Sequence, residues 1–378
     1  MKRKVIEITE KVVIYENPIP NLVSRHAYFP GLAKMPSGDI IALFTVAEAF
    51  ESINSAISIA RSKDGGRTWK MEGQIFKNPV FNRMGPSSFK PTVLKDGTVI
   101  VIGYGFRRDN PEVLVNPETG GLPEGLNLIS FSMDEGRTWS EPEKIPLSRP
   151  ETLETSGACI QLANGEIIAT GATFPVWDGT RPSGRVGVLL RSKDNGRSWD
   201  DRTLFYRSSD GNVIAYETRS CQMQDGRIVV ILWLLDEVKG KNLTNHIVVS
   251  QDNGYTWSTP LDTGIPGQAS NLLPLQDNFL LSVHCYREGD TGLYVNIVDF
   301  SDDRWKVITT EKIWGNTGAK KIGGLKDMGK NLKFGQPSIL PVGEEEFLVV
   351  HWTVEDCLGK IFAHRIRIDL AKAFKRVS

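Results

Sequence analysis

The chain lacks the features that mark several large classes of protein. Its 45 lysines and arginines are balanced by 45 aspartates and glutamates, and no basic run occurs. We therefore expect no nucleic-acid partner and no membrane-surface partner. No apolar stretch reaches the roughly 18 residues that a membrane span needs, and the N-terminus shows no signal peptide. These absences favour a cytoplasmic location, with secretion after removal of a leader as the alternative.

Cysteine is scarce and scattered. The four cysteines lie in apolar, strand-like stretches without a CxxC pair: Cys159, Cys221, Cys285 and Cys357. This pattern predicts reduced, buried core residues rather than a zinc site or a redox pair. We expect no metal and no cofactor. Helical periodicity is also nearly absent, and only the segment Asp369–Phe374 is typical of a helix.

A repeat is what the chain has instead. Four segments share the pattern S-x-D-x-G-x-[ST]-W, which we call the Asp box: Ser62–Trp69, Ser132–Trp139, Ser192–Trp199 and Ser250–Trp257. A degenerate fifth copy ends at Trp305. In such a turn the Asp side chain accepts bonds from backbone amides, Gly supplies a positive φ and Trp packs on the strands. The boxes are therefore predicted to be structural turns.

A second repeat interleaves with the first. Six short turns, such as Asp96-Gly97 and Asn164-Gly165, are each followed by a strand rich in β-branched and apolar residues. Six hairpins predict an all-β, six-bladed β-propeller that forms one domain over residues 1–378. The last blade has room for three strands only. The N-terminal segment KVIEITEKVVIYE is expected to supply its fourth strand and to close the ring.

Strand direction predicts where a site would lie. The hairpin turns and the Asp boxes share one side of the disc, so the long, varied loops share the other side, where binding residues collect. The starts of the innermost strands and the ends of the second strands point into that mouth, and Glu154 and Tyr104 stand among them. Aromatic, acidic and basic groups that converge in this way favour a sugar site.

The boxes and hairpins resemble the sialidase superfamily, also called Asp-box propellers, over nearly the whole chain. That resemblance implies a Tyr nucleophile paired with Glu, an Asp acid/base and three Arg that hold the substrate carboxylate. The match of these residues is incomplete. Tyr28 stands where the first Arg is expected, and Phe50 replaces the Arg of an Ala-Glu-x-Arg motif that begins at Ala47 and Glu48.

The other positions of the motif differ as well. The loop expected to carry the acid/base Asp offers only Glu51 or Asn54, and Trp233 replaces an expected Arg. Gln336 stands where the nucleophilic Tyr is expected, and only the family Glu is matched, by Glu217. Because a carboxylate substrate needs bidentate Arg partners, we predict that the protein is not a sialidase.

We predict instead a glycoside hydrolase that acts on an oligosaccharide, with an acidic sugar as one option. The alternatives are a non-catalytic carbohydrate- or protein-binding propeller and a uronate-specific polysaccharide lyase. The candidate catalytic residues are Glu217, Glu48, His26 and Tyr28. The candidate substrate-binding residues are Arg25, Lys90, Arg107, Arg219, Trp233, Asp236, His284, Arg287, Gln336, His351 and Glu355. The two histidines His284 and His351 occupy similar places in successive blades and are expected to face each other across the mouth.

Overall fold

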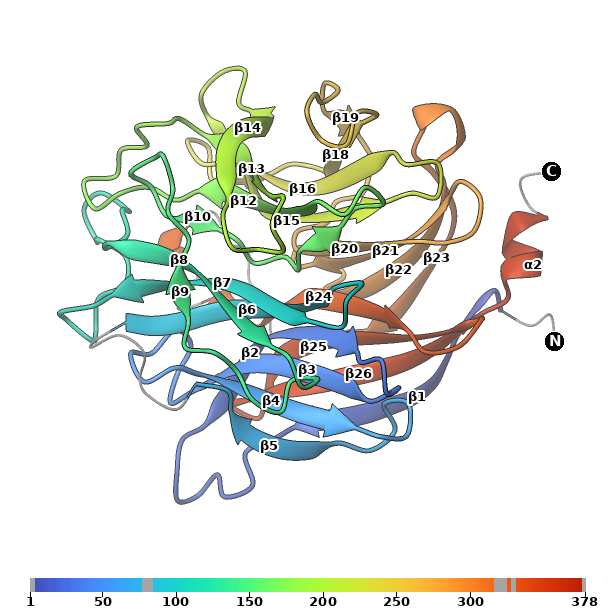
Figure 1. The fold of residues 1–378 in the computed structure, drawn as a ribbon, viewed down its shortest axis with the longest axis horizontal. Helices are drawn as coiled ribbons and strands as arrows, with labels where there is room; N and C mark the ends of the chain where they lie inside the picture. Colours follow the sequence, from blue (N-terminus) through green and yellow to red (C-terminus); the bar gives the residue numbers. More distant parts are fainter. Residues whose placement is uncertain (1–3, 77–83, 316–324, 328–330, 376–378) are drawn as a thin grey trace.

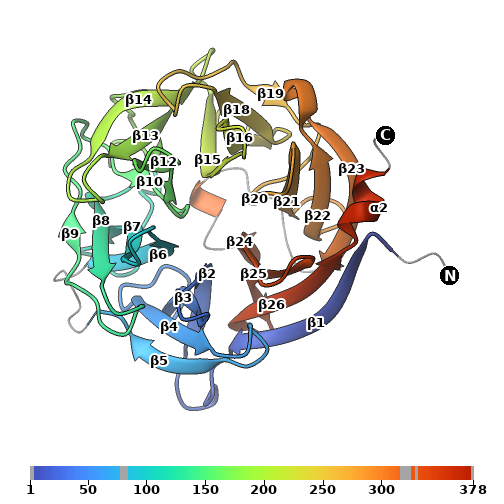
Figure 2. The ribbon, with the colours of Figure 1, turned by 45° about the vertical axis from the view of Figure 1, so that its right-hand side comes forward.

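The computed structural model describes residues 4–76, 84–315, 325–327 and 331–375. Its strands form six antiparallel sheets around one axis, as Figure 2 shows, and they follow one another along the chain (Figure 1). The six-bladed β-propeller predicted from the hairpins is therefore confirmed. Within the described residues, no helix is long and apolar enough to cross a membrane.

Each blade runs from an innermost strand at the axis to an edge strand at the rim. From the axis outward, the first is β2 (His26–Lys34), β3 (Ile40–Ala47), β4 (Ala56–Ser62) and β5 (Lys70–Gln74), and the second is β6 (Met84–Val93), β7 (Val99–Arg107), β8 (Gly125–Ser132) and β9 (Glu143–Lys144). The third is β10 (Leu153–Glu154) with β11 (Ile160–Gln161), then β12 (Ile167–Thr173), β13 (Val186–Ser192) and β14 (Asp200–Arg207). The fourth is β15 (Val213–Gln222), β16 (Ile228–Asp236) with β17 (Lys241–Asn242), β18 (His246–Ser250) and β19 (Leu261–Asp262). The fifth is β20 (Ser270–Pro274), β21 (Phe279–Tyr286), β22 (Gly292–Asp299) and β23 (Lys306–Trp314). The sixth is β24 (Phe334–Pro341), β25 (Glu346–Glu355), β26 (Leu358–Ile368) and β1 (Ile6–Tyr15).

The N-terminal strand closes the ring, as the sequence predicts. β1 pairs antiparallel with β26, from Ile6 opposite Ile368 to Tyr15 opposite Ile361. The expected helical tail is also present as α2 (Leu370–Phe374), where the Asp369 side chain accepts a bond from the Lys372 amide. The described residues also include two 3₁₀ turns, η1 (Ser301–Asp303) and η2 (Leu325–Asp327).

Each Asp box is a turn held by the bonds that its residue types predict. In the first box the Ser62 hydroxyl accepts a bond from the Gly66 amide at 2.7 Å and donates to Asp64 at 2.7 Å. Asp64 also accepts from the amide and hydroxyl of Thr68, and the Trp69 indole donates to the Gly66 carbonyl. The other three boxes repeat these bonds.

The boxes also join neighbouring blades, which the sequence did not indicate. A Cβ added to Gly66 would overlap the Leu348 side chain of the sixth blade, and one added to Gly254 would lie 3.1 Å from Leu189 of the third blade. Each of these box glycines therefore packs closely against the preceding blade. The absence of a side chain on each glycine allows both this close contact and the positive φ.

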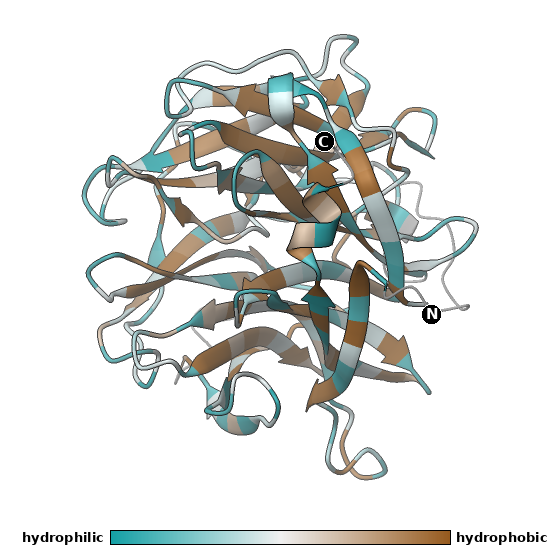
Figure 3. Cartoon of the chain, turned by 90° about the vertical axis from the view of Figure 1, so that its right-hand side faces the viewer, coloured by the Kyte–Doolittle hydropathy of each residue, from teal (hydrophilic) through white to brown (hydrophobic). Residues whose placement is uncertain are grey.

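The hydrophobic core lies between the blades. Each of six clusters of buried apolar residues combines strands of two neighbouring blades, and apolar residues are concentrated in the strands in Figure 3. A further cluster lies under the loops of the mouth and is rich in aromatic rings, among them Tyr104, Phe174, Tyr216 and Trp233. The four cysteines are free, but Cys357 is exposed, so the prediction that it is buried is wrong. Cys357 lies in the tight turn between β25 and β26, where its φ is 63°.

One backbone feature shapes the axis. In four blades the innermost strand has one more residue than its partner between two pairs, which makes a β-bulge. Each bulge holds a non-glycine residue at positive φ: Phe29 at 58°, Ser88 at 55°, Glu217 at 45° and Gln336 at 44°. Such backbone is costly for residues with a side chain and gathers at functional sites. The bulges therefore indicate where the site lies.

Candidate functional site

Two buried glutamates from neighbouring blades meet at the axis. The Glu217 amide, in the bulge of β15, donates a bond of 2.7 Å to Oε2 of Glu154 at the end of β10. Burial, followed by the negative charge of Glu217, raises the pKa of Glu154 to about 7. Among the described residues, Glu154 Oε1 and Glu217 Oε2 are buried and have no hydrogen-bond partner. One oxygen of each carboxyl group therefore remains free to bond a ligand.

The bulges of the second and sixth blades hold Glu217 in place. The Gln336 amide nitrogen donates to Glu217 Oε1 at 3.1 Å, and the Ser88 hydroxyl donates to Gln336 Oε1 at 3.0 Å. All three residues have a positive φ. The three bulges thus form one hydrogen-bonded chain that ends on the Glu217 carboxylate. Gln336, which stands where the sialidase nucleophile is expected, is here a donor to that carboxylate.

Two buried cations belong to the same cluster. Lys90 donates to the carbonyl oxygens of Phe29 and Pro30 at 2.5 and 3.1 Å, and Arg219 donates to Ser156 Oγ at 3.0 Å. Burial, together with the nearby Arg219 charge, holds the pKa of Lys90 well below its usual range, while Glu217 and Glu154 oppose this shift. The structure thus brings Lys90 and Arg219 to the carboxylates, where Lys90 bonds to backbone carbonyls.

A small cavity lies over the carboxylates. It has a volume of about 40 Å³, which is room for a few water molecules at most. Its lining is mainly aromatic and apolar and consists of Phe29, Tyr104, Glu154, Phe174, Tyr216, Glu217, Trp233, Leu235, Leu325 and Gln336. Figure 2 shows that η2, which carries Leu325, lies near the middle of the ring.

A larger hollow of about 470 Å³ adjoins this cavity and shares Tyr104, Phe174 and Leu325 with it. Glu51 lines the hollow and accepts a bond of 2.9 Å from Ser87, and burial raises the pKa of its carboxyl group. Burial and the charges of Glu154, Glu51 and Glu217 raise the pKa of Tyr104 well above its usual range. Tyr104 therefore stays protonated, and it lies close enough to all three carboxyl groups to interact electrostatically with them.

Arg287 lies behind the wall of the small cavity. Its guanidinium is 5.3 Å from the Trp233 ring and 5.8 Å from the Phe334 ring, and its Nε donates to the Phe334 carbonyl at 3.1 Å. Both terminal nitrogens are buried without a hydrogen-bond partner among the described residues. A Cβ at Gly335 would overlap one of them. A larger residue at position 335 would therefore require this guanidinium to move.

An aromatic cluster occupies the first blade where the family resemblance places two arginines. Tyr28 makes edge contacts with Phe50 and Trp352 at 5.2 Å between ring centroids, and Phe29 packs on the same two rings. Tyr28 is 3% exposed and Trp352 is fully buried. Charged partners for a substrate carboxylate are therefore replaced by apolar packing.

The structure places the remaining sequence-predicted residues away from the small cavity. Glu48 is exposed one residue beyond β3, and His26 accepts a bond from the Gly359 amide at the start of β26 in the sixth blade. His284 bonds to Asn296 and His351 to His364, each within its own blade, so the two do not face each other across the mouth. The others lie at the ends of strands or in loops: Arg25, Arg107, Asp236 and Glu355.

Sequence reasoning left Glu154, Tyr104 and Glu51 out of the candidate site. The position of Glu154 at the start of an innermost strand, and of Tyr104 at the end of a second strand, was the available signal. Glu51 carried a weaker signal, because it lies in a loop. Its positive φ of 54° contributes to the local turn from which it contacts Ser87.

Known structures support the fold. A protein of unknown function from Dyadobacter fermentans is 24% identical with a TM-score of 0.76, and 96% of this chain covers 99% of that one. A Hadza microbial sialidase is 16% identical with a TM-score of 0.67, the match covering 96% of this chain and 69% of that one. The Trypanosoma rangeli sialidase is 13% identical with a TM-score of 0.63, and the match covers 98% of this chain but 59% of that one.

The chain has the sialidase-type propeller fold. At these identities the likeness establishes the fold and not the chemistry. No protein-family model matches the chain, and no curated protein sequence matches it.

Proposed function

We propose that this protein is a glycoside hydrolase that cleaves an oligosaccharide at the axial mouth, with Glu154 and Glu217 as its reacting pair. The observation that carries the proposal is the bond from the Glu217 backbone amide to the Glu154 carboxyl group, which brings the two buried residues together, with a carboxyl pKa of about 7 at Glu154. A glycosidase needs one carboxyl group that keeps its proton near neutral pH and a second that is ionised.

The proposed roles follow from these environments. Glu154, protonated below its pKa of about 7, gives its proton to the glycosidic oxygen as the bond to the anomeric carbon breaks. The Glu217 carboxylate, held by Gln336, stabilises the positive charge that develops on that carbon. Water supplies the oxygen that bonds to the anomeric carbon, and its released proton goes to a carboxylate of the pair.

Sialic acid does not suit this site. Two positions at which the family resemblance expects an Arg hold Tyr28 and Trp233, both at least nine-tenths buried. Arg287 lies behind the cavity wall beside Gln336, and its two terminal nitrogens, which have no hydrogen-bond partner among the described residues, place positive charge next to the site. An acidic sugar other than sialic acid is therefore included among the substrates to be tested.

A second candidate function is non-catalytic sugar binding. It is favoured by the small cavity, whose 40 Å³ cannot contain a sugar ring while Leu325 lies against it. In that case a sugar would bind only in the adjoining hollow of about 470 Å³, beside Tyr104 and Glu51.

A panel of substrates tests the two functions. The purified protein is incubated with 4-nitrophenyl glycosides of neutral sugars, uronic acids and sialic acid, and with plant and bacterial polysaccharides. Release of nitrophenol and of reducing ends reports hydrolysis, and absorbance of an unsaturated uronate reports lyase activity. Hydrolysis that Glu217→Gln abolishes and Glu7→Gln, an exposed control on β1, retains is the expected result. Binding without turnover would replace the proposal with the second candidate, and sialoside cleavage would overturn the substrate assignment.

A further inference from the structure

A third hollow adjoins the hollow of about 470 Å³. It has a volume of about 680 Å³ and shares Arg108, Val113 and Pro117 with the hollow of about 470 Å³. That hollow in turn shares Tyr104, Phe174 and Leu325 with the cavity over the carboxylates. The three spaces therefore adjoin one another in a row from the cavity over Glu154 and Glu217 to Trp177, and we call this row the path. The two outer hollows each have the size of a typical ligand pocket.

Two loops build the wall of the outer hollow, and bonds to one another hold them. Asn116 Nδ2 and Thr119 Oγ1 donate to the Trp177 carbonyl at 3.0 and 2.7 Å, and the Leu122 amide donates to the Pro175 carbonyl at 3.2 Å. A Cβ at Gly121 would overlap the Val176 carbonyl, so the loops touch backbone to backbone. The outer hollow is therefore preformed.

Arg108 fixes the floor between the outer two hollows. It is 7% exposed and donates to the carbonyl oxygens of Glu51 and Pro111 at 2.5 and 2.7 Å. This side chain ties the loop of the first blade to that of the second. The path thus runs over a surface whose backbone is bonded across three blades.

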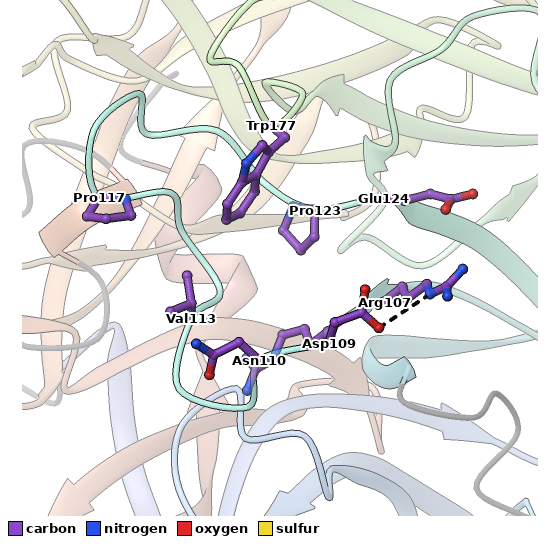
Figure 4. Close-up of a pocket in the computed structure, with 9 residues that line it drawn as sticks. Arg107, Asp109, Asn110, Val113, Pro117, Pro123, Glu124 and Trp177 are labelled. Atoms are coloured by element: carbon purple, nitrogen blue, oxygen red, sulfur yellow. Dashed lines mark ion pairs between the residues drawn. The ribbon is translucent and has the colours of Figure 1, made fainter.

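Trp177 is the most unusual residue of the outer hollow. These loop contacts hold its backbone carbonyl, yet 47% of the residue is exposed. In Figure 4 the indole reaches into the hollow between Pro117 and Pro123, with Asn110 and Asp109 on the opposite side. An indole held in this way offers a flat apolar face, which suits the C–H face of a sugar ring.

The polar residues around the indole suit an uncharged chain of hydroxyl groups. Arg107 and Arg108 are matched in number by Asp109 and Glu124, and Arg107 lies 3.8 Å from Asp109 in an ion pair. Donors and acceptors are thus present without an excess of either charge. A strongly charged partner would lack a complementary field here.

We propose that the two outer hollows bind one oligosaccharide of several units, with the bond to be cleaved next to the small cavity at the axis and a distant sugar stacked on Trp177. This inference rests on the proposed function, which it extends from a single sugar at the axis to an extended chain. In this inference Trp177 gives longer substrates a higher affinity, and Glu154 and Glu217 remain the reacting groups.

Binding to an inactive variant tests the inference without turnover. The Glu217→Gln protein is titrated calorimetrically with hexasaccharides of arabinose, galactose, xylose, mannose, glucose and galacturonic acid, and with the matching disaccharides. We expect one hexasaccharide to bind at least about tenfold more tightly than its disaccharide. Adding Trp177→Ala should remove about tenfold of affinity for the hexasaccharide and leave the disaccharide unchanged, because one stacked ring contributes about 1.4 kcal/mol.

A matched control is Tyr255→Ala on the Asp-box side, where Tyr255 is 49% exposed. It should leave both affinities unchanged. The inference is overturned if no hexasaccharide binds more tightly than its disaccharide, or if Trp177→Ala leaves the difference intact. Cleavage of a nitrophenyl monosaccharide without any length dependence would overturn the path and keep the hydrolase. Length-dependent binding without turnover by the unmutated protein would overturn the hydrolase and keep the path.

Discussion

The Asp-box face and the mouth of the propeller differ in what repeats from blade to blade. On the box face one set of bonds recurs four times, with the Ser hydroxyl accepting from the Gly amide at 2.7 to 2.8 Å in every box. At the mouth four blades share a backbone bulge but carry four different side chains, Phe29, Ser88, Glu217 and Gln336. Repetition in both sequence and geometry marks the scaffold, whereas repeated geometry with varied side chains marks the site.

The largest expected effect is a loss of activity at the mouth while the fold is retained. Glu154→Gln should lower the rate of hydrolysis by at least about 100-fold, because it removes the proton donor. Initial rates on the substrate identified by the panel measure this, and thermal unfolding checks that the fold is retained. Glu48→Gln compares the structural assignment with the one made from sequence. A large loss there, with full activity in Glu154→Gln, would restore the sequence assignment.

The next largest effect is a loss of stability at the Asp-box face while activity is retained. Ser192 is 1% exposed, and Ser192→Ala should lower the free energy of unfolding by about 1–3 kcal/mol because the buried Gly196 amide loses its acceptor. Ser198→Ala in the same box is the control, since its hydroxyl bonds to Asp194 at the exposed side of the turn. Urea unfolding gives both values. Activity per folded molecule should not change in either variant, and a selective loss of activity would contradict the division between the faces.

A smaller effect is expected in the pH dependence of stability, to which Glu154 at the mouth and His364 inside a blade contribute with opposite sign. Burial raises the pKa of Glu154 from 4.5 to about 7, so the folded state holds an additional proton between these values and this carboxyl group lowers stability as the pH rises. Burial lowers the pKa of His364 from 6.5 to about 4, so its contribution to stability is present above 6.5 and is lost as the pH falls towards 4.

Urea midpoints across this pH range, for the unmutated protein and Glu154→Gln, measure the two contributions. Between pH 4.5 and 6.5 the two contributions have opposite slopes, so removing the Glu154 contribution should make stability rise more steeply with pH in the variant than in the unmutated protein. The rate of hydrolysis should also fall as the pH rises through about 7, where Glu154 loses its proton. The same dependence of the urea midpoint on pH in Glu154→Gln and in the unmutated protein would mean that Glu154 does not contribute.

For the last substitution, Gln336→Tyr, we expect no effect on sialoside cleavage. Gln336→Tyr places the family nucleophile at its expected position, yet we expect no release of a fluorophore from a sialoside. The carboxylate of sialic acid would still meet Tyr28 and Trp233 where Arg partners are expected. A fluorescent sialoside assay measures this, and detectable turnover would show that the nucleophile alone was missing.

Much of the fold could be predicted because its determinants are local. Asp and Gly at fixed positions specify a box, and alternating apolar residues around a two-residue turn specify a hairpin. Even the closing pair of β1 and β26 followed from a missing strand in the sixth blade. Exposure of Cys357 was missed because it depends on a tight turn, with a φ of 51° at Asp356, that carries no glycine.

The site was harder to predict because it depends on where side chains point. Glu217 was found from its place in an innermost strand. Glu48 follows the last residue of β3 and lies in solvent, while Glu51, three residues later, reaches Ser87. His284 and His351 correctly mark equivalent blade positions, but their side chains bond within the sheets.

The amino-acid sequence by itself determined the number of blades, the closure of the ring and the face on which the boxes lie, since these depend on turns and strand periods of a few residues. Only the tertiary structure decided that Glu154 pairs with Glu217 and that Gln336 and Ser88 complete the chain at the axis. The physical reason is the bulge. One extra residue reverses which side chains face inward, and the groups that then meet are 63 to 248 residues apart in the chain.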